Sequence, residues 1–205
     1  MSDIRKLDPE QLWSFFHDIT QIPHPSKKET RIVEYVVKFG KEHKLETVVD
    51  KVGNVIIRKP PTKGMEKRKG VILQTHLDMV PQKNNDKKHD FEKDPIQTII
   101  DGDWVKADGT TLGSDNGIGV AAALSVLASK NLPHGPVEGL FTIDEETGMT
   151  GVFGLKKGLL KGDILLNLDS EDENELCVRC AGGMDISATK NIRRRKLLRG
   201  WLLTE

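Results

Sequence analysis

The sequence contains little cysteine: two residues among 205, Cys177 and Cys180. Two cysteines exclude the set of several disulfides that stabilises many small secreted domains. The Cys-x-x-Cys spacing fits a redox pair or half of a structural zinc site, but no second cysteine pair is present to complete such a site. We therefore expect two reduced thiols on a strand-like segment that ends at Cys180.

The sequence also lacks net charge and long apolar runs. Lysine plus arginine equal aspartate plus glutamate at 31 each, so no overall field favours nucleic acid or an anionic membrane. No segment approaches the roughly 18 apolar residues of a membrane span, and no signal-peptide pattern follows Met1. We expect a cytoplasmic protein without a nucleic-acid or membrane partner. The length suffices for a domain with a well-buried core.

Apolar runs with helix or strand spacing alternate along the chain. A capping box at Ser26 and Glu29 is typical of a helix start, and residues 81–103 have the polar, punctuated composition of a long surface loop. The predicted helices cover 9–19, 32–39, 117–127 and 152–160, and the predicted strands cover 47–49, 55–57, 70–75, 137–143 and 163–168. This alternation predicts an α/β fold with a mixed, largely parallel sheet and flanking helices.

Acidic and imidazole side chains stand where the apolar runs stop. They are His76, Asp78, Asp115, Glu145, Glu146 and Asp169. Each has an ordinary explanation by itself, as a core histidine, a helix cap, a solvated acidic turn or a loop cap. In an α/β sheet, however, ligands bind at the carboxyl ends of the strands, where these groups would meet. Gathered carboxylates are costly without cations, and two divalent metal ions are the simplest candidate.

The spacing of these side chains fits a two-metal hydrolase. His76 and Asp78 are two residues apart at a strand end, so both can serve one site. Asp115 lies among glycines and suits a carboxylate that bridges two cations, and Asp78 suits one that fixes the tautomer of His76. In extended geometry Glu145 and Glu146 would point to different sides. One could then bind metal while the other, for which Glu145 is suited, moves a proton.

Three segments, residues 74–81, 109–119 and 144–148, resemble the motifs of the co-catalytic zinc dipeptidases, and in particular those of the aminoacyl-histidine dipeptidases. The resemblance extends from about residue 7 to residue 187. It implies hydrolysis of dipeptides with an unblocked N-terminus, including Xaa-His substrates. It also implies two divalent metal ions, chiefly Zn²⁺, although the donor set also accommodates Co²⁺ or Mn²⁺.

The resemblance assigns a role to each candidate metal ligand. His76 and Asp169 would bind one ion, Glu146 would bind the other, and Asp115 would bridge the two. These assignments come from the family motifs that the sequence matches.

The resemblance also assigns the catalytic residues. Asp78 would orient the imidazole of His76, and Glu145 would act as the general base. The peptide bond before Asn116 would be cis, as it often is in the family.

The family pattern ends before the chain does. Residues 1–187 resemble the N-terminal part of the catalytic domain, whereas residues 188–205 form an aberrant basic tail, which an altered reading frame explains better than a nucleic-acid patch. The lid and dimerisation domain, through which full-length relatives would form homodimers, and a fifth metal ligand have no counterpart. We therefore expect weak binding of the second ion, little peptidase activity, and exposed apolar strand edges that favour self-association.

Two further functions fit the same metal motifs. A related zinc aminopeptidase or carboxypeptidase, or an N-acyl amino acid deacylase, would share the metal ligands and differ in the residues that grip the substrate. The alternative outside enzymes is an inactive fragment that binds metal. A panel of substrates separates the enzymes from one another, and zinc content together with the mass by light scattering identifies the fragment.

Overall fold

The computed structural model describes residues 3–170, 177–178 and 187–190. The chain divides near Glu171, and the residues before this point form one compact unit, which is called the first unit below. All helices and strands assigned in the described residues belong to the first unit. Cys177 is exposed, whereas Cys180 and most of the basic tail lie outside the described residues. The predicted boundary at residue 187 therefore stays a prediction.

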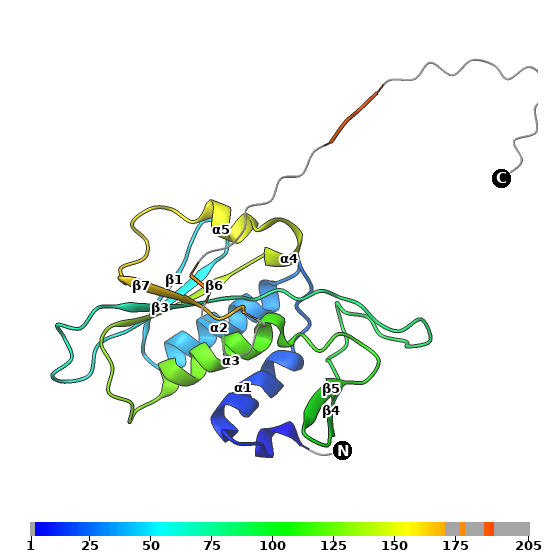
Figure 1. Cartoon of the computed structure of the whole chain (residues 1–205), viewed down its shortest axis with the longest axis horizontal. Helices are drawn as coiled ribbons and strands as arrows, with labels where there is room; N and C mark the ends of the chain where they lie inside the picture. Colours follow the sequence, from blue (N-terminus) through cyan, green and yellow to red (C-terminus); the bar gives the residue numbers. More distant parts are fainter. Residues whose placement is uncertain (1–2, 171–176, 179–186, 191–205) are drawn as a thin grey trace, which may run out of the picture. The chain divides into compact units, whose positions relative to one another are not determined.

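A five-stranded mixed sheet organises the first unit (Figure 1). Its strands, in spatial order, are β1 (Glu46–Val49), β2 (Val55–Lys59), β6 (Val137–Thr142), β3 (Val71–His76) and β7 (Ile164–Asn167). The predicted strands 47–49 and 55–57 correspond to β1 and β2, which pair antiparallel, and β2 is also antiparallel to β6. In contrast, β3 pairs in parallel with both β6 and β7. The predicted α/β fold with a mixed sheet is confirmed.

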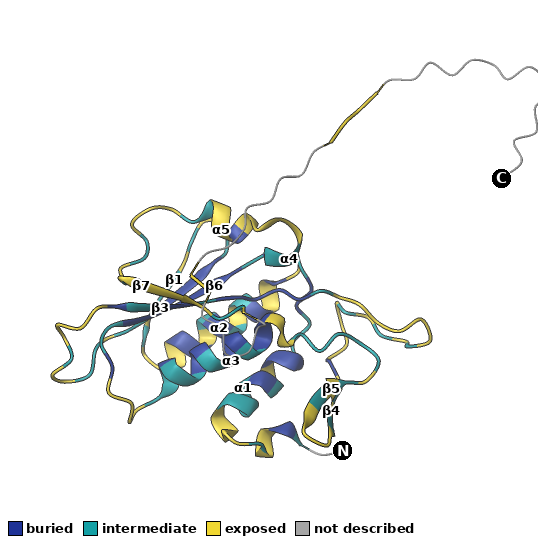
Figure 2. Cartoon of the chain, in the orientation of Figure 1, coloured by how far each residue is buried: buried dark blue, intermediate teal, exposed yellow. Residues whose placement is uncertain are grey.

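Two helices, α2 (Thr30–Glu42) and α3 (Ser114–Ala128), cover one face of this sheet (Figure 1). A third, α1 (Glu10–Thr20), which follows the short helix η1 (Ile4–Lys6), packs against α3. Phe16, Val36 and Leu124, one from each helix, form a buried cluster with Ile57 and Phe141 of the sheet. Figure 2 shows the buried residues where the helices meet the strands. Burial of each such side chain contributes about 1.5–3 kcal/mol. No helix in the described part of the chain is long and apolar enough to cross a membrane.

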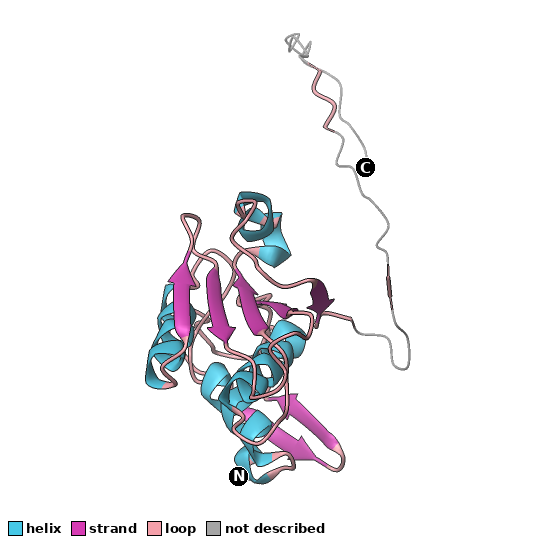
Figure 3. Cartoon of the chain, turned by 90° about the vertical axis from the view of Figure 1, so that its left-hand side faces the viewer, coloured by secondary structure: helices cyan, strands magenta, loops and turns pink. Residues whose placement is uncertain are grey.

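The opposite face carries a smaller apolar cluster. Ile56, Ile72 and Leu140 form it, covered by leucines of residues 155–160. Here the predicted helix 152–160 was wrong, because α5 (Thr150–Gly154) ends where Leu155 turns to an extended conformation, and the short α4 (Glu145–Gly148) precedes it. Figure 3 shows the sheet between the longer helices on one side and the short ones on the other.

The predicted surface loop 81–103 contains regular structure that the sequence analysis missed. Strands β4 (Thr98–Asp101) and β5 (Trp104–Ala107) form an antiparallel hairpin. Residues 102–103 join them, and Gly102 has φ 61°, the left-handed conformation that tight hairpin turns require. A Gly-Asp pair between two short runs with β-branched residues was the available signal.

The predicted capping box was also wrong. Helix α2 begins at Thr30, and Ser26 and Glu29 do not bond each other's backbone. Instead, the hydroxyl of Ser26 donates to Asp78, and the carboxylate of Glu29 accepts from the backbone of Lys27 and Asp144. Partners distant in sequence have replaced the local ones. Pro9 likewise stands before α1 rather than in its first turn.

The strand β7 lies at the edge of the sheet and is exposed along its length. The exposed fractions of Ile164, Leu165 and Leu166 are 41%, 51% and 42%. An apolar edge of this kind was expected from the sequence. Its self-association remains a prediction.

Candidate metal centre

The carboxyl ends of three neighbouring parallel strands bring the candidate side chains together. His76 is the last residue of β3, and Asp78 follows two residues later. Glu145 and Glu146 begin α4 directly after β6, and Asp169 follows β7. Because β6, β3 and β7 run in the same direction, their ends meet at one edge of the sheet.

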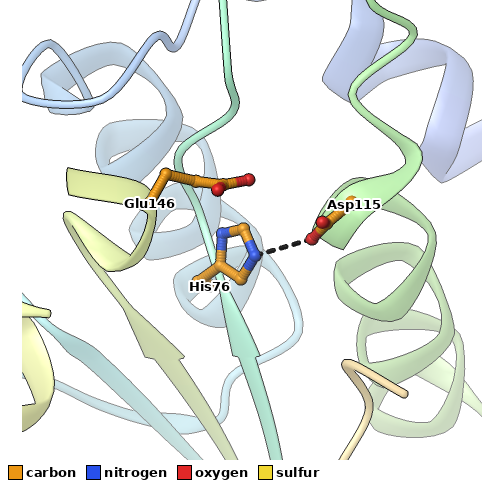
Figure 4. Close-up of side chains that lie close together, drawn as sticks. All are labelled: His76, Asp115 and Glu146. Carbon is orange, nitrogen blue, oxygen red and sulfur yellow. Dashed lines mark hydrogen bonds and ion pairs between the residues drawn. The ribbon is translucent and has the colours of Figure 1, made fainter. Parts of the chain in front are cut away.

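His76 stands at the centre of the cluster (Figure 4). Ligand atoms of His76, Asp115 and Glu146 all lie within 4.8 Å of one another. Nε2 of His76 is 2.8 Å from Oδ1 of Asp115 and 3.5 Å from Oδ1 of Asp169. One imidazole nitrogen therefore faces two carboxylates, from the start of α3 and from the segment after β7.

The other side of the imidazole faces Asp78. Nδ1 of His76 is 3.3 Å from Oδ1 of Asp78 and 3.0 Å from its backbone oxygen, and both side chains are fully buried. Burial by itself raises the pKa of Asp78. His76, the backbone N–H of Glu145 and the hydroxyl of Ser26 outweigh burial and hold that pKa at about 2. Asp78 is thus an anion placed to fix the ring of His76.

The neighbouring carboxylates also change the pKa of the His76 imidazole. Burial lowers the pKa of His76, but Asp169, Asp78 and Asp115 together raise it to about 11. The hydrogen bond with His76 in turn lowers the pKa of Asp169. In the metal-free chain, a protonated imidazole is therefore the positive charge at the centre of the cluster.

Glu145 and Glu146 lie in a helical turn, so the extended geometry expected for this pair was wrong. Asp144 precedes them with a φ of 51°, in the left-handed region, and turns the chain from β6 into α4. Both side chains are half-buried, and burial raises the pKa of each carboxyl. The side chain of Glu146 approaches His76 and Asp115.

The donor set fits divalent cations. The cluster offers one imidazole nitrogen and several carboxylates, ligands that Zn²⁺ and related ions accept. In the described residues, no lysine or arginine forms an ion pair with Asp115, Glu146 or Asp169. Among these groups, only His76 offsets the negative charge of the carboxylates. Bound cations would compensate the negative charge that remains.

The side chain of Asn116 bonds the segment of Leu168 and Asp169 to the start of α3. The peptide bond between Asp115 and Asn116 is cis, as the resemblance implied. The side-chain amide of Asn116, which is 2% exposed, donates to the Leu168 carbonyl at 3.2 Å and to Asp169. A Cβ on Gly119 would collide with Asn116 and lie 3.0 Å from the Leu168 oxygen. The sequence analysis missed Asn116, and the glycine one helical turn later was its only local signal.

A small hollow opens beside the cluster. It has a volume of about 210 Å³ and is lined by Ser114, Asp115, Asn116, Asp169 and their neighbours. A larger hollow of about 590 Å³ lies at the opposite end of the strands, where Gly70 and Val137 begin β3 and β6. We assign the candidate site to the smaller hollow, because the carboxylates of Asp115 and Asp169 line it.

The chain is similar in sequence and in fold to known peptidases. Over 201 residues the chain is 55% identical to the cytosol non-specific dipeptidase of Escherichia coli K12, a match that covers 98% of this chain and 41% of that protein. The crystal structure of aminoacylhistidine dipeptidase from Vibrio alginolyticus superposes with a TM-score of 0.82 at 60% identity, over 84% of this chain and 35% of that one. An aminopeptidase from Bacillus cereus superposes with a TM-score of 0.68 at 26% identity, over 81% and 44% of the two chains.

The chain thus spans about 41% of the length of its Escherichia coli relative. The family model described as Peptidase family M20/M25/M40 matches residues 72–181, which include all six candidate residues. The resemblance found in the motifs is confirmed, and the chain belongs to peptidase family M20/M25/M40.

Proposed function

We propose that this chain carries the metal-binding part of a dipeptidase that uses two divalent ions, with Zn²⁺ as the expected occupant. His76 and Asp169 would hold one ion, Glu146 would hold the other, and Asp115 would be the ligand shared by the two. The observation that supports this proposal is the convergence of one imidazole nitrogen and three carboxylates, without a lysine or arginine partner among the described residues, at the carboxyl edge of the sheet.

Two such ions supply a water of lowered pKa and a positive clamp for the attacked oxygen when they are bound. Asp78 holds Nδ1 of His76, so that Nε2 points into the cluster. Glu145 is half-buried with a raised carboxyl pKa, which suits a general base that works near neutral pH. It takes a proton from the attacking water and passes it to the leaving amine.

The donors are divided unequally between the two positions. Within the described residues, one ion would have His76, Asp169 and the shared Asp115, whereas the other would have Glu146 and the shared Asp115. We therefore infer that the first ion binds more tightly than the second. A cobalt titration with two resolved steps would support this order, and two equal steps would contradict it.

The proposed substrates are dipeptides with a free N-terminus, including Xaa-His. Support comes from the names of the Escherichia coli and Vibrio alginolyticus relatives, of which this chain spans less than half. The name of the Escherichia coli protein also supports a cytoplasmic location. A homodimer of the full-length form, through a lid and dimerisation domain, belongs to the same proposal.

A chimera tests the function directly. Residues 1–170 of this chain replace the matching residues of the Escherichia coli relative, and the chimera is assayed with Zn²⁺ on dipeptides, tripeptides and N-acyl amino acids. We expect hydrolysis of dipeptides, including Xaa-His, and a kcat about 10²- to 10⁴-fold lower for Glu145→Ala. Glu34→Ala, at an exposed position of α2, is the matched control and leaves kcat unchanged.

Each other result selects a different conclusion. If the chimera prefers tripeptides or N-acyl amino acids, the proposed substrate class of dipeptides is wrong and the preferred class takes its place. A zinc-loaded chimera in which Glu145→Ala keeps its kcat would remove Glu145 from the role of general base. If neither the chain nor the chimera binds Zn²⁺, the proposed metal centre is wrong.

A further inference from the structure

Buried carboxylates receive three consecutive backbone N–H groups at the turn that carries Glu145 and Glu146. The N–H of Asp144 donates to Oε1 of Glu29 at 3.1 Å. The N–H groups of Glu145 and Glu146 donate to Oδ1 and Oδ2 of Asp78, at 2.9 and 3.2 Å. Two side chains therefore fix the path of the turn. Asp78 belongs to the site already described, whereas Glu29 has no role in it so far.

Glu29 joins two turns that are distant in sequence. Its Oε1 also accepts from the N–H of Lys27 at 2.8 Å, in the loop before α2. Both Lys27 and Asp144 have positive φ, 68° and 51°. The residue is 7% exposed, and no lysine or arginine pairs with it in the described part of the chain. A buried carboxylate is costly, and the two charge-assisted hydrogen bonds offset part of that cost.

The side chain of Asp144 closes the turn from the other side. Its carboxylate accepts from the hydroxyls of Thr147 and Thr150, the latter at 2.6 Å. Carboxylate oxygens of Glu29, Asp78 and Asp144 lie within 4.8 Å of one another, and all three residues are buried. Asp78 connects this acidic layer to His76, whereas Glu29 and Asp144 accept from backbone N–H groups and threonine hydroxyls, respectively.

We propose that Glu29 is a positioning residue of the metal centre, which holds the Asp144 backbone so that Glu145 and Glu146 keep their places. Glu29 touches neither the ions nor the substrate and acts through one backbone N–H. The inference rests on the proposed function for its consequence on metal binding. Its structural part, the restraint of the turn, stands without any metal.

Hydrogen exchange on the metal-free chain tests the structural part. In Glu29→Ala, the amide of Asp144 loses its buried acceptor and the turn loses one of its two restraints. The amides of residues 144–146 should therefore exchange on the order of tenfold faster, while β6 and α3 keep their protection. Glu29→Asp withdraws the carboxylate by one methylene and should show the same local change more weakly. Glu29→Gln keeps an oxygen in place and should resemble the parent chain. Glu34→Ala, at an exposed position of α2 five residues after Glu29, is the control for lost charge.

Cobalt titration followed by visible absorption tests the consequence. Glu29→Ala should weaken the second ion, whose ligand is Glu146, by about 10-fold and leave the first within about twofold. Glu29→Gln should restore the parent affinity. Unchanged exchange of residues 144–146 in Glu29→Ala would overturn the proposal. So would equal loss of both ions, or a Glu29→Gln variant as defective as Glu29→Ala. A parent chain that binds no cobalt refutes the proposed function instead, and the exchange experiment still decides the restraint.

Discussion

Replacement of Asp78 by asparagine removes the anion that connects His76 with the turn of Glu145 and Glu146. The Oδ1 atom of Asp78 accepts from the Glu145 N–H, and Oδ2 accepts from the Glu146 N–H and the Ser26 hydroxyl. An asparagine has an NH₂ group in place of one oxygen, so one backbone N–H must then face a donor. A hydrogen bond to a charged group contributes about 1.5–3 kcal/mol, and an unsatisfied buried donor costs about 1–3 kcal/mol.

We therefore expect Asp78→Asn to lower the free energy of unfolding of the metal-free chain by roughly 2–4 kcal/mol. Urea denaturation at neutral pH measures this change, and the affinity for the first cobalt ion should fall about 10- to 100-fold in the same variant. Ser26→Ala removes one donor to the same carboxylate but leaves no buried donor unsatisfied, and it is the matched control, with an expected loss of about 1.5 kcal/mol, the lower end of the range for a bond to a charged group. An Asp78→Asn variant within about 0.5 kcal/mol of the parent chain and with unchanged cobalt affinity would refute the reasoning.

Three further predictions follow from the same geometry. Gly119→Ala should lower the melting temperature, because the added Cβ would collide with Asn116. Helix propensity alone predicts the opposite, since alanine is the better helix former by about 1 kcal/mol. A higher melting temperature would contradict the contact between Asn116 and the segment of Leu168 and Asp169. In the metal-free chain, protonated His76 stabilises the fold fully below pH 6.5, and this contribution decreases as the pH rises to about 11. Ionised Asp78 stabilises the fold above pH 3.8, and this contribution is lost as the pH falls to about 2. Stability should therefore be greatest between about pH 4 and 6.5, and His76→Gln should flatten its decline on the alkaline side; an unchanged decline would exclude His76 as its cause. Calorimetry of Zn²⁺ binding at pH 7 in buffers of different ionisation enthalpy should show release of about one proton per first ion, and no release would mean that His76 is neutral in the free chain.

The sequence was sufficient for the sheet and for the residues of the cluster. Buried strands can be recognised in a sequence as mostly apolar runs, and β3 and β6 are of this kind. The polar residues after them, His76 and Asp78 in particular, then had to lie at one edge, since parallel neighbours end together. The topology of parallel strands therefore accounts for the candidates that follow β3, β6 and β7, whereas Asp115 comes from the start of α3.

Local rules failed where partners distant in sequence decide the structure. Ser26 and Glu29 have the spacing of a capping box, yet Ser26 donates to Asp78 and Glu29 accepts from the N–H of Asp144, both distant in sequence. The backbone after β6 was expected to be extended, but Asp78 and Glu29 hold its N–H groups in a helical turn. No pattern confined to ten or fifteen residues contains these contacts, so the supporting residues had to come from the structure.

Anomalous scattering at the zinc edge, from crystals of this chain grown with Zn²⁺, tests the central claim most directly. The account predicts two peaks about 3.5–4 Å apart, the stronger one beside His76 and Asp169 and the weaker one beside Glu146, with Asp115 between them. A single peak remote from His76, or no peak with the side chains in their present places, would contradict the two-metal centre.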